Sequence, residues 1–261
     1  MGTKATFDQL GQYSNKANKV FDLLKTGVRS FDDVERMMQH IIEGKLPADA
    51  KPIVALSSAG FTPASEQIAQ FRQWNFHNGI RFDDAAIDDA LSSVPFVDSD
   101  DPLVALTLCW TLVDLVSTVN SYLGVMKVVY GDKLYVSPDL CTGSEYLSLP
   151  KGAPEFVPNR LWWEITDFGA NRNMAPDQVP AATAAGLSVF AAACHHPAVV
   201  RRHNGDDVPY WDVPGLRVKV PGGSRPYAPC IGGSSDGSVN VDVRSADDAY
   251  SGYAGPVDVR E

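Results

Sequence analysis

The sequence predicts an α+β fold: a helical N-terminal half that ends in a long central helix, then an antiparallel sheet that carries one Ala-rich helix. In the first half, apolar residues recur every three or four positions, which is the spacing of one helix face. Residues 102–126 are the most hydrophobic window, with Asp114 as their only formal charge. Near the C-terminus, apolar and polar residues alternate, as in a sheet with one solvated face.

The N-terminal helices are expected over residues 7–26 and 30–44, paired as a hairpin. Ser30 is suited to cap the second helix, and Gly44 to end it. The short apolar run 51–56 favours a buried strand.

A third helix is predicted over residues 62–78, with Thr62 as N-cap and Pro63 as first helical residue. A fourth, shorter helix over 83–91 begins with two aspartates, which suit the positive end of a helix dipole.

We expect residues 102–126 to form a core helix rather than a membrane span. Asp114 near the middle would cost about 3 kcal/mol at the bilayer centre on insertion scales, and the acidic entry side offers no basic anchor. Asp100 or Asp101 is expected to cap this helix. Asp114 is then expected on the exposed face of this helix, and the alternative is a buried carboxylate that needs a partner.

The second half is expected to be mainly strands, interrupted by one helix over 177–195 that Asp177 introduces. Its Ala-rich composition predicts close packing. Gly222-Gly223 and Asp236-Gly237 are suited to turns. The predicted strands are 133–137, 161–166, 216–220, 239–244 and 257–260.

The Pro-containing segment 147–160 is the best candidate for a domain boundary. It would divide a mainly helical region, 1–146, from a mainly antiparallel β region with one helix, 147–261. The alternative is one continuous domain in which this segment is an ordered loop.

Composition limits the function classes. The chain has 261 residues and a formal net charge of −10. Nucleic-acid binding needs a cationic footprint, so the charge argues against it. The four cysteines are widely spaced and are expected to be reduced thiols. No apolar run of signal-peptide length is present at the N-terminus, so we expect a soluble cytoplasmic protein.

The densest group of metal-ligand residue types is Cys194, His195 and His196, followed by His203 and Asp206. Zinc is bound by thiolate and imidazole ligands, so Cys194, His196, His203 and distant Cys230 are one ligand set to consider. The spacing matches no standard zinc motif. Because the stretch ends a predicted helix, where cationic side chains are favoured, we expect helix-end histidines and no metal or cofactor.

A second candidate is the predicted strand 161–166, in which Trp162, Glu164 and Thr166 share the face opposite Leu161, Trp163 and Ile165. Trp162 next to a carboxylate suits an interface anchor, or a platform that stacks a sugar or a cation. Glu164 with Asp167 or Asp114 would make an acid/base pair. The alternative is a second buried layer over Trp162.

The C-terminal part of the chain contains several short motifs. They are Leu-Trp-Trp-Glu-Ile-Thr-Asp-Phe-Gly-Ala-Asn, Ala-Gly-Leu-Ser-Val-Phe-Ala-Ala-Ala, His196-Pro197, Val208-Pro209-Tyr210 and the ending Gly-Pro-Val-Asp-Val-Arg-Glu. In these motifs, roughly the last hundred residues resemble a set of uncharacterised bacterial hypothetical proteins. This resemblance implies no activity and no functional residue.

Two hypotheses follow. The first is a non-enzymatic binding or assembly protein that acts through a protein partner or self-association, with Trp162 as interface residue. The alternative is a hydrolase or metal-assisted enzyme that uses His195, His196 or His203 with Asp206 or Glu164. The sequence leaves open whether the protein is an enzyme.

Overall fold

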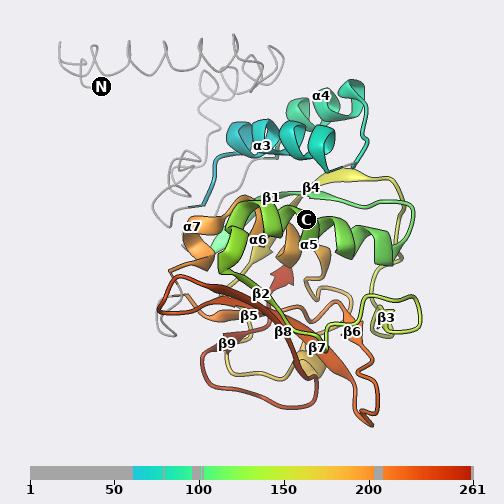
Figure 1. Cartoon of the computed structure of the whole chain (residues 1–261), viewed down its shortest axis with the longest axis vertical. Coiled ribbons are helices and arrows are strands. Elements are labelled where there is room, and N and C mark those ends of the chain that lie inside the picture. Colours follow the sequence, from blue (N-terminus) through green and yellow to red (C-terminus); the bar gives the residue numbers. More distant parts are fainter. Residues whose placement is uncertain (1–60, 79, 96–100, 102, 203–207, 260–261) are drawn as a thin grey trace, which may run out of the picture.

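The computed structural model describes residues 61–78, 80–95, 101, 103–202 and 208–259. These residues form alternating layers of helix and sheet (Figure 1). Helices α3 (Ala64–His77) and α4 (Asp84–Ser92) cover one face of a three-stranded sheet. Helices α5 (Leu115–Tyr130) and α6 (Leu187–His195) lie between that sheet and a seven-stranded sheet.

The three-stranded sheet has the order β1 (Val104–Trp110), β4 (Leu161–Asp167) and β10 (Val257–Asp258), and every neighbouring pair is antiparallel. All seven residues of β1 are buried. Helices cover both faces of this strand, so it needs no polar alternation and its sequence is a continuous apolar run.

The long central helix predicted over 102–126 is therefore wrong. The first part of that window is β1, and α5 begins only after it. Asp114 is the N-cap of α5, where Oδ1 accepts a hydrogen bond from Ser117 N at 2.6 Å. Its exposure was predicted correctly, although it lies at a helix start and not in a helix interior.

Side chains form hydrogen bonds with backbone groups on the free edge of β1. Gln67 of α3 donates to Leu106 O at 2.9 Å and accepts from Leu108 N at 2.9 Å. Tyr122 of α5 accepts from Trp110 N at 2.9 Å and donates to Trp110 O at 2.7 Å. These contacts remove the exposed hydrogen-bonding edge on which another strand would pair.

The seven-stranded sheet contains both parallel and antiparallel pairs, so the prediction of an antiparallel sheet is wrong. Strand β2 runs parallel to β8, and β5 runs parallel to β9. The main path has the order β2-β8-β7-β5-β9, and β6 joins β3 to β7. The strands are β2 (Leu134–Val136), β3 (Leu147–Ser148), β5 (Tyr210–Asp212), β6 (Arg217–Val218), β7 (Tyr227–Gly233), β8 (Val239–Ser245) and β9 (Tyr253–Ala254).

The Ala-rich helix is shorter than predicted. Residues 176–178 form a 3-10 turn, η3 (Pro176–Gln178), and α6 starts only after Gly186, which is its N-cap. Pro180 lies between the two and lacks the N–H that a helix interior needs. A further short helix, α7 (Pro197–Val200), follows α6, and the 3-10 turn η2 (Gly131–Lys133) follows α5.

The predicted fold class is thus wrong: the described chain is rich in sheet, and strands from both halves of the sequence share its layers. The helices predicted over 62–78 and 83–91 are confirmed, as are the strands over 133–137, 161–166 and 239–244. The predicted start of the first of these helices is wrong by one residue, because Pro63 and not Thr62 is the N-cap of α3 and Ala64 is its first helical residue. Only short strands occur within 216–220 and 257–260. The helices over 7–26 and 30–44 and the strand over 51–56 lie outside the described residues.

One main hydrophobic cluster runs through the layers and includes side chains from both sides of position 146. Trp110 is a fully buried member of this cluster, with its ring centroid 5.3 Å from that of Phe71 and 4.0 Å from that of Tyr122. A smaller cluster, built on Val94, Val104 and Leu106, fills the space beneath α3 and α4.

Candidate functional site

The candidate site is a pocket of about 130 Å³, which we call the Trp162 pocket. It lies where β4, β10, the start of α6 and two loops meet. Its lining residues are Thr111, Leu149, Ala153, Pro154, Glu155, Phe156, Val157, Arg160, Trp162, Glu164, Ala184, Gly186, Leu187, Ser188, Gly215, Leu216 and Asp258.

Strand alternation places the acidic groups of the pocket. Trp162, Glu164 and Thr166 share one face of β4, as predicted from the sequence. Asp258 of β10 is the direct partner of Thr166 in the register, so it shares that face. Glu164 and Asp258 are then diagonal neighbours, a relation in which positions lie roughly 7–8 Å apart.

The carboxylate of Asp258 is held by two hydroxyl groups. Its Oδ1 accepts from Ser188 Oγ at 2.7 Å and from Thr166 Oγ1 at 2.9 Å. Ser188 lies in the first turn of α6, where the helix dipole carries partial positive charge. The same carboxylate therefore both satisfies buried hydroxyls and offsets the positive end of α6.

Trp162 joins the second carboxylate to a cation. Its indole Nε1 donates to Glu164 Oε2 at 2.8 Å. On its ring lies the guanidinium of Arg160, with Cζ 4.9 Å from the ring centroid. The indole thus orients Glu164 through its edge and binds a cation through its face.

Buried Cys109 of β1, the register partner of Trp162, lies close to all of these charges. Burial raises the pKa of the Cys109 thiol, the carboxylates of Glu164 and Asp258 raise it further, and Arg160 opposes them. Cys109 is therefore a neutral thiol beneath the pocket.

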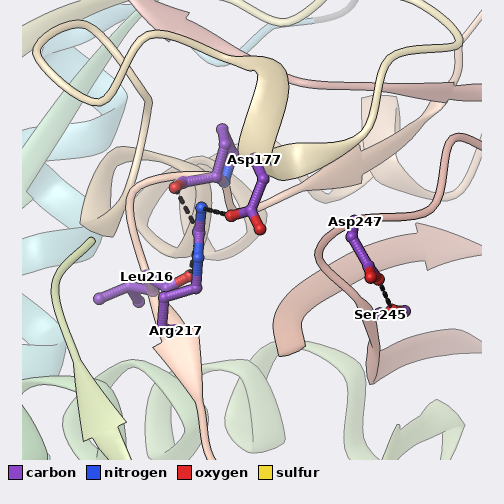
Figure 2. Close-up of polar contacts among 6 residues, drawn as sticks. Asp177, Leu216, Arg217, Ser245 and Asp247 are labelled. Carbon is purple, nitrogen blue, oxygen red and sulfur yellow. Dashed lines mark hydrogen bonds and ion pairs between the residues drawn. The ribbon is translucent and has the colours of Figure 1, made fainter. Parts of the chain in front are cut away.

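The apolar wall formed by Leu216 is fixed by Arg217 (Figure 2). Arg217 Nη1 donates to Leu216 O at 2.8 Å and to Pro214 O at 2.7 Å, and Nη2 pairs with Asp177. Next to Leu216, a Cβ on Gly215 would lie 2.7 Å from Ala184 O, so only glycine fits this wall.

The pocket has a net acidic character. Among the described residues that line it, Glu155, Glu164 and Asp258 contribute three carboxylates, against one guanidinium and about half a positive charge from the start of α6. Leucine side chains and Trp162 form apolar walls around these groups. The arrangement suits a cationic group carried on an apolar stem.

His196, one of the predicted site residues, is completely buried and lies in the core. Its Nδ1 accepts from Thr62 N at 3.0 Å, and because a backbone N–H only donates, the proton must be on Nε2. Nε2 then donates to Thr107 Oγ1, 3.1 Å away. Burial lowers the pKa of His196 to about 3, so the ring is a neutral structural group.

His195 and Cys194 are also buried. His195 Nδ1 lies 3.0 Å from Gln70 Oε1, and burial, with His196 nearby, lowers its pKa. Burial raises the pKa of Cys194, and its Sγ contacts Tyr122 O at 3.6 Å. His203 and Asp206 lie outside the described residues.

Among the residues that the structure describes, no group of three or more His, Cys, Asp or Glu side chains is arranged to hold a metal ion. Cys230, a member of the zinc set considered from the sequence, lies in β7. Burial raises its pKa to about 12. Of the predicted candidates within the described chain, only Trp162 and Glu164 line the pocket.

The acid partners considered for Glu164 lie elsewhere. Asp114 caps α5, and Asp167 lies on the other face of β4, where Oδ1 accepts from Gly169 N at 2.8 Å. The carboxylate that shares the pocket with Glu164 is Asp258, which sequence reasoning did not identify. The alternation of residues 257–260 predicts which face of its strand Asp258 occupies, but it does not predict which strand lies next to it.

A second missed cluster lies in the large sheet. Arg244 is a polar position of the predicted strand 239–244, and the alternation of that strand would place it on the solvated face. In the structure it is only 8% exposed and forms a two-point ion pair with fully buried Asp212, with both N–O distances 2.6 Å. Burial raises the pKa of Asp212 to about 7, and Arg244 opposes this rise. The guanidinium also lies over the rings of Tyr250 and Tyr253, at 4.6 and 4.3 Å.

Within the described ranges, no helix has both the length and the apolar character needed to cross a membrane. In comparisons with known proteins, no family model, curated protein or solved structure matched the chain.

Proposed function

We propose that this is a non-enzymatic binding protein whose Trp162 pocket receives a basic side chain, arginine or lysine, of a protein partner. The supporting observation is a pocket with apolar walls that leads to the carboxylates of Glu164 and Asp258. Apolar walls suit the methylene stem of such a side chain, and the carboxylates suit its charged end.

The size of the pocket supports one side chain as occupant. An engineered protein cavity of about 150 Å³ holds a molecule of benzene, and the Trp162 pocket has about 130 Å³. That volume fits one side chain or a small head group. Trp162 is partly buried, and an aromatic residue with adjacent charges is also the composition of an interface hot spot.

The charge of the chain favours a basic partner over a second copy. With 22 Lys and Arg against 32 Asp and Glu residues, two copies repel each other at long range. A basic protein is instead attracted, which accelerates its association. Self-association stays an outcome that light scattering of the purified protein would detect.

A titration with N-acetyl-arginine methylamide tests the proposal. The indole N–H resonance of Trp162, assigned by its loss in Trp162→Phe, should shift because that proton is bonded to Glu164. A single residue is expected to bind with Kd of about 1 mM. Glu164→Gln should weaken binding about tenfold, because a charge-assisted hydrogen bond becomes a neutral one.

Two controls make the result specific. The neutral isostere N-acetyl-citrulline methylamide should bind much more weakly than the arginine probe. Asp167→Asn removes a carboxylate from the opposite face of the same strand and should leave binding unchanged. Equal binding of both probes, or equal effects of the two variants, would contradict the proposal.

The alternative proposal is a hydrolase that uses Glu164 with Asp258 in place of the histidines. The observation that favours it is that both carboxylates line one pocket. It predicts turnover of a nitrophenyl glycoside panel that is lost in Glu164→Gln and in Asp258→Asn. Absence of turnover together with specific arginine binding would favour the binding function.

A further inference from the structure

We infer that Arg160 is an affinity-determining residue of the Trp162 pocket, an internal cation that occupies the binding face of Trp162 until a ligand displaces it. This inference rests on the proposed function, since it concerns the same pocket. It adds that a guanidinium group of the protein itself, that of Arg160, already occupies part of the pocket that receives a basic side chain.

The first observation is the position of the guanidinium. Arg160 lines the pocket, and its Cζ lies 4.9 Å from the centroid of the Trp162 ring. A planar guanidinium stacks on an indole face. An incoming arginine side chain would need the same face, so the two cations compete for it.

The second observation is that the Arg160 backbone is fixed while its side chain is exposed. Arg160 N donates to Thr111 Oγ1 at 3.0 Å, and Arg160 O accepts from Thr111 N at 2.8 Å. Thr111 Oγ1 also donates to Val157 O at 2.5 Å, which ties the preceding loop to the same point. Displacement therefore requires only side-chain rotation about a fixed Cα.

The third observation is electrostatic. Arg160, Glu164 and Asp258 line the same pocket, and at the buried thiol of Cys109 the charge of Arg160 opposes the charges of the two carboxylates. Arg160 thus offsets part of the negative charge of the pocket. A bound cation would take over this role when Arg160 leaves.

The experiment compares two variants that each remove one positive charge. Arg160→Met keeps an unbranched apolar side chain but has no guanidinium. Lys151→Met changes an exposed residue of the adjoining loop that does not line the pocket. Arg160→Met should bind N-acetyl-arginine methylamide about tenfold more tightly than wild type, and Lys151→Met less than about twofold more tightly.

A direct readout accompanies the affinities. In wild type, nuclear Overhauser contacts between the Arg160 δ protons and the Trp162 ring should disappear as the arginine probe saturates the pocket. If wild type binds the probe but Arg160→Met binds no tighter than Lys151→Met, or if the contacts persist at saturation, the inference is overturned while the proposed function stands. If neither wild type nor Arg160→Met binds, both fail.

Discussion

Acidification from pH 7.5 to 4.5 should destabilise this protein through its buried histidines. The pKa of His196 falls from its ordinary value of 6.5 to about 3 in the folded protein. Between these values the unfolded chain binds the proton more strongly, so stability is present above pH 6.5 and is lost as the pH falls. At pH 4.5, two units below 6.5, the loss from His196 is about 3 kcal/mol.

Urea denaturation across this pH range, in wild type and in His196→Asn, measures this loss. The asparagine Oδ1 can replace Nδ1 as acceptor for Thr62 N but does not titrate. The stability difference between wild type and variant should therefore shrink by about 3 kcal/mol from pH 7.5 to pH 4.5.

A third protein, Val189→Ala, provides the control, because it removes a buried side chain of α6 that has no proton to exchange. Its stability curve should run parallel to that of wild type. Parallel curves for wild type and His196→Asn as well would show that His196 titrates normally, and the assignment of the neutral ring to the core would be wrong.

Three further predictions concern contacts that stabilise the fold. Tyr122→Phe leaves Trp110 N and O without their partner and should cost about 1–3 kcal/mol in urea unfolding. Gly215→Ala should cost about 1–3 kcal/mol, because its Cβ would lie 2.7 Å from Ala184 O, whereas Gly124→Ala in α5 meets nothing within 4 Å and should stabilise by about 0.5–1 kcal/mol. Arg244→Met leaves Asp212 buried without its cation and should cost about 3–5 kcal/mol at pH 7, measured in the same way.

The error over residues 102–126 shows where sequence reasoning fails. An apolar run is equally typical of a buried helix and of a strand covered on both faces, and periodicity does not separate them. The decisive local signal was Asp114 followed by Ser117, which is a helix start. Placing that start correctly would have left only residues 102–113 before it, a stretch short enough for one strand, and the seven-residue strand β1 lies within it.

The face of β4 was predictable because alternation is a local property. Trp162 and Glu164 lie together as their spacing requires. Their partners were not predictable, since Thr166 and Asp258 are separated by 92 residues and meet only because β10 pairs with β4. The exposure of Arg244 was predicted wrongly for the same reason, because its ion-pair partner Asp212 lies on another strand and is buried.

The two carboxylates of the pocket are held in different ways, and this difference bears on how a ligand would bind. Asp258 Oδ1 accepts two hydroxyl groups from buried side chains, so its position is set by the packing of α6 and β4. Glu164 is oriented by the indole of Trp162, whose face carries the side chain of Arg160. A ligand that displaces Arg160 therefore alters the surroundings of Glu164 but leaves Asp258 in place. Asp258 is the preorganised half of the pocket, and the ordering cost of binding falls on the half formed by Arg160, Trp162 and Glu164.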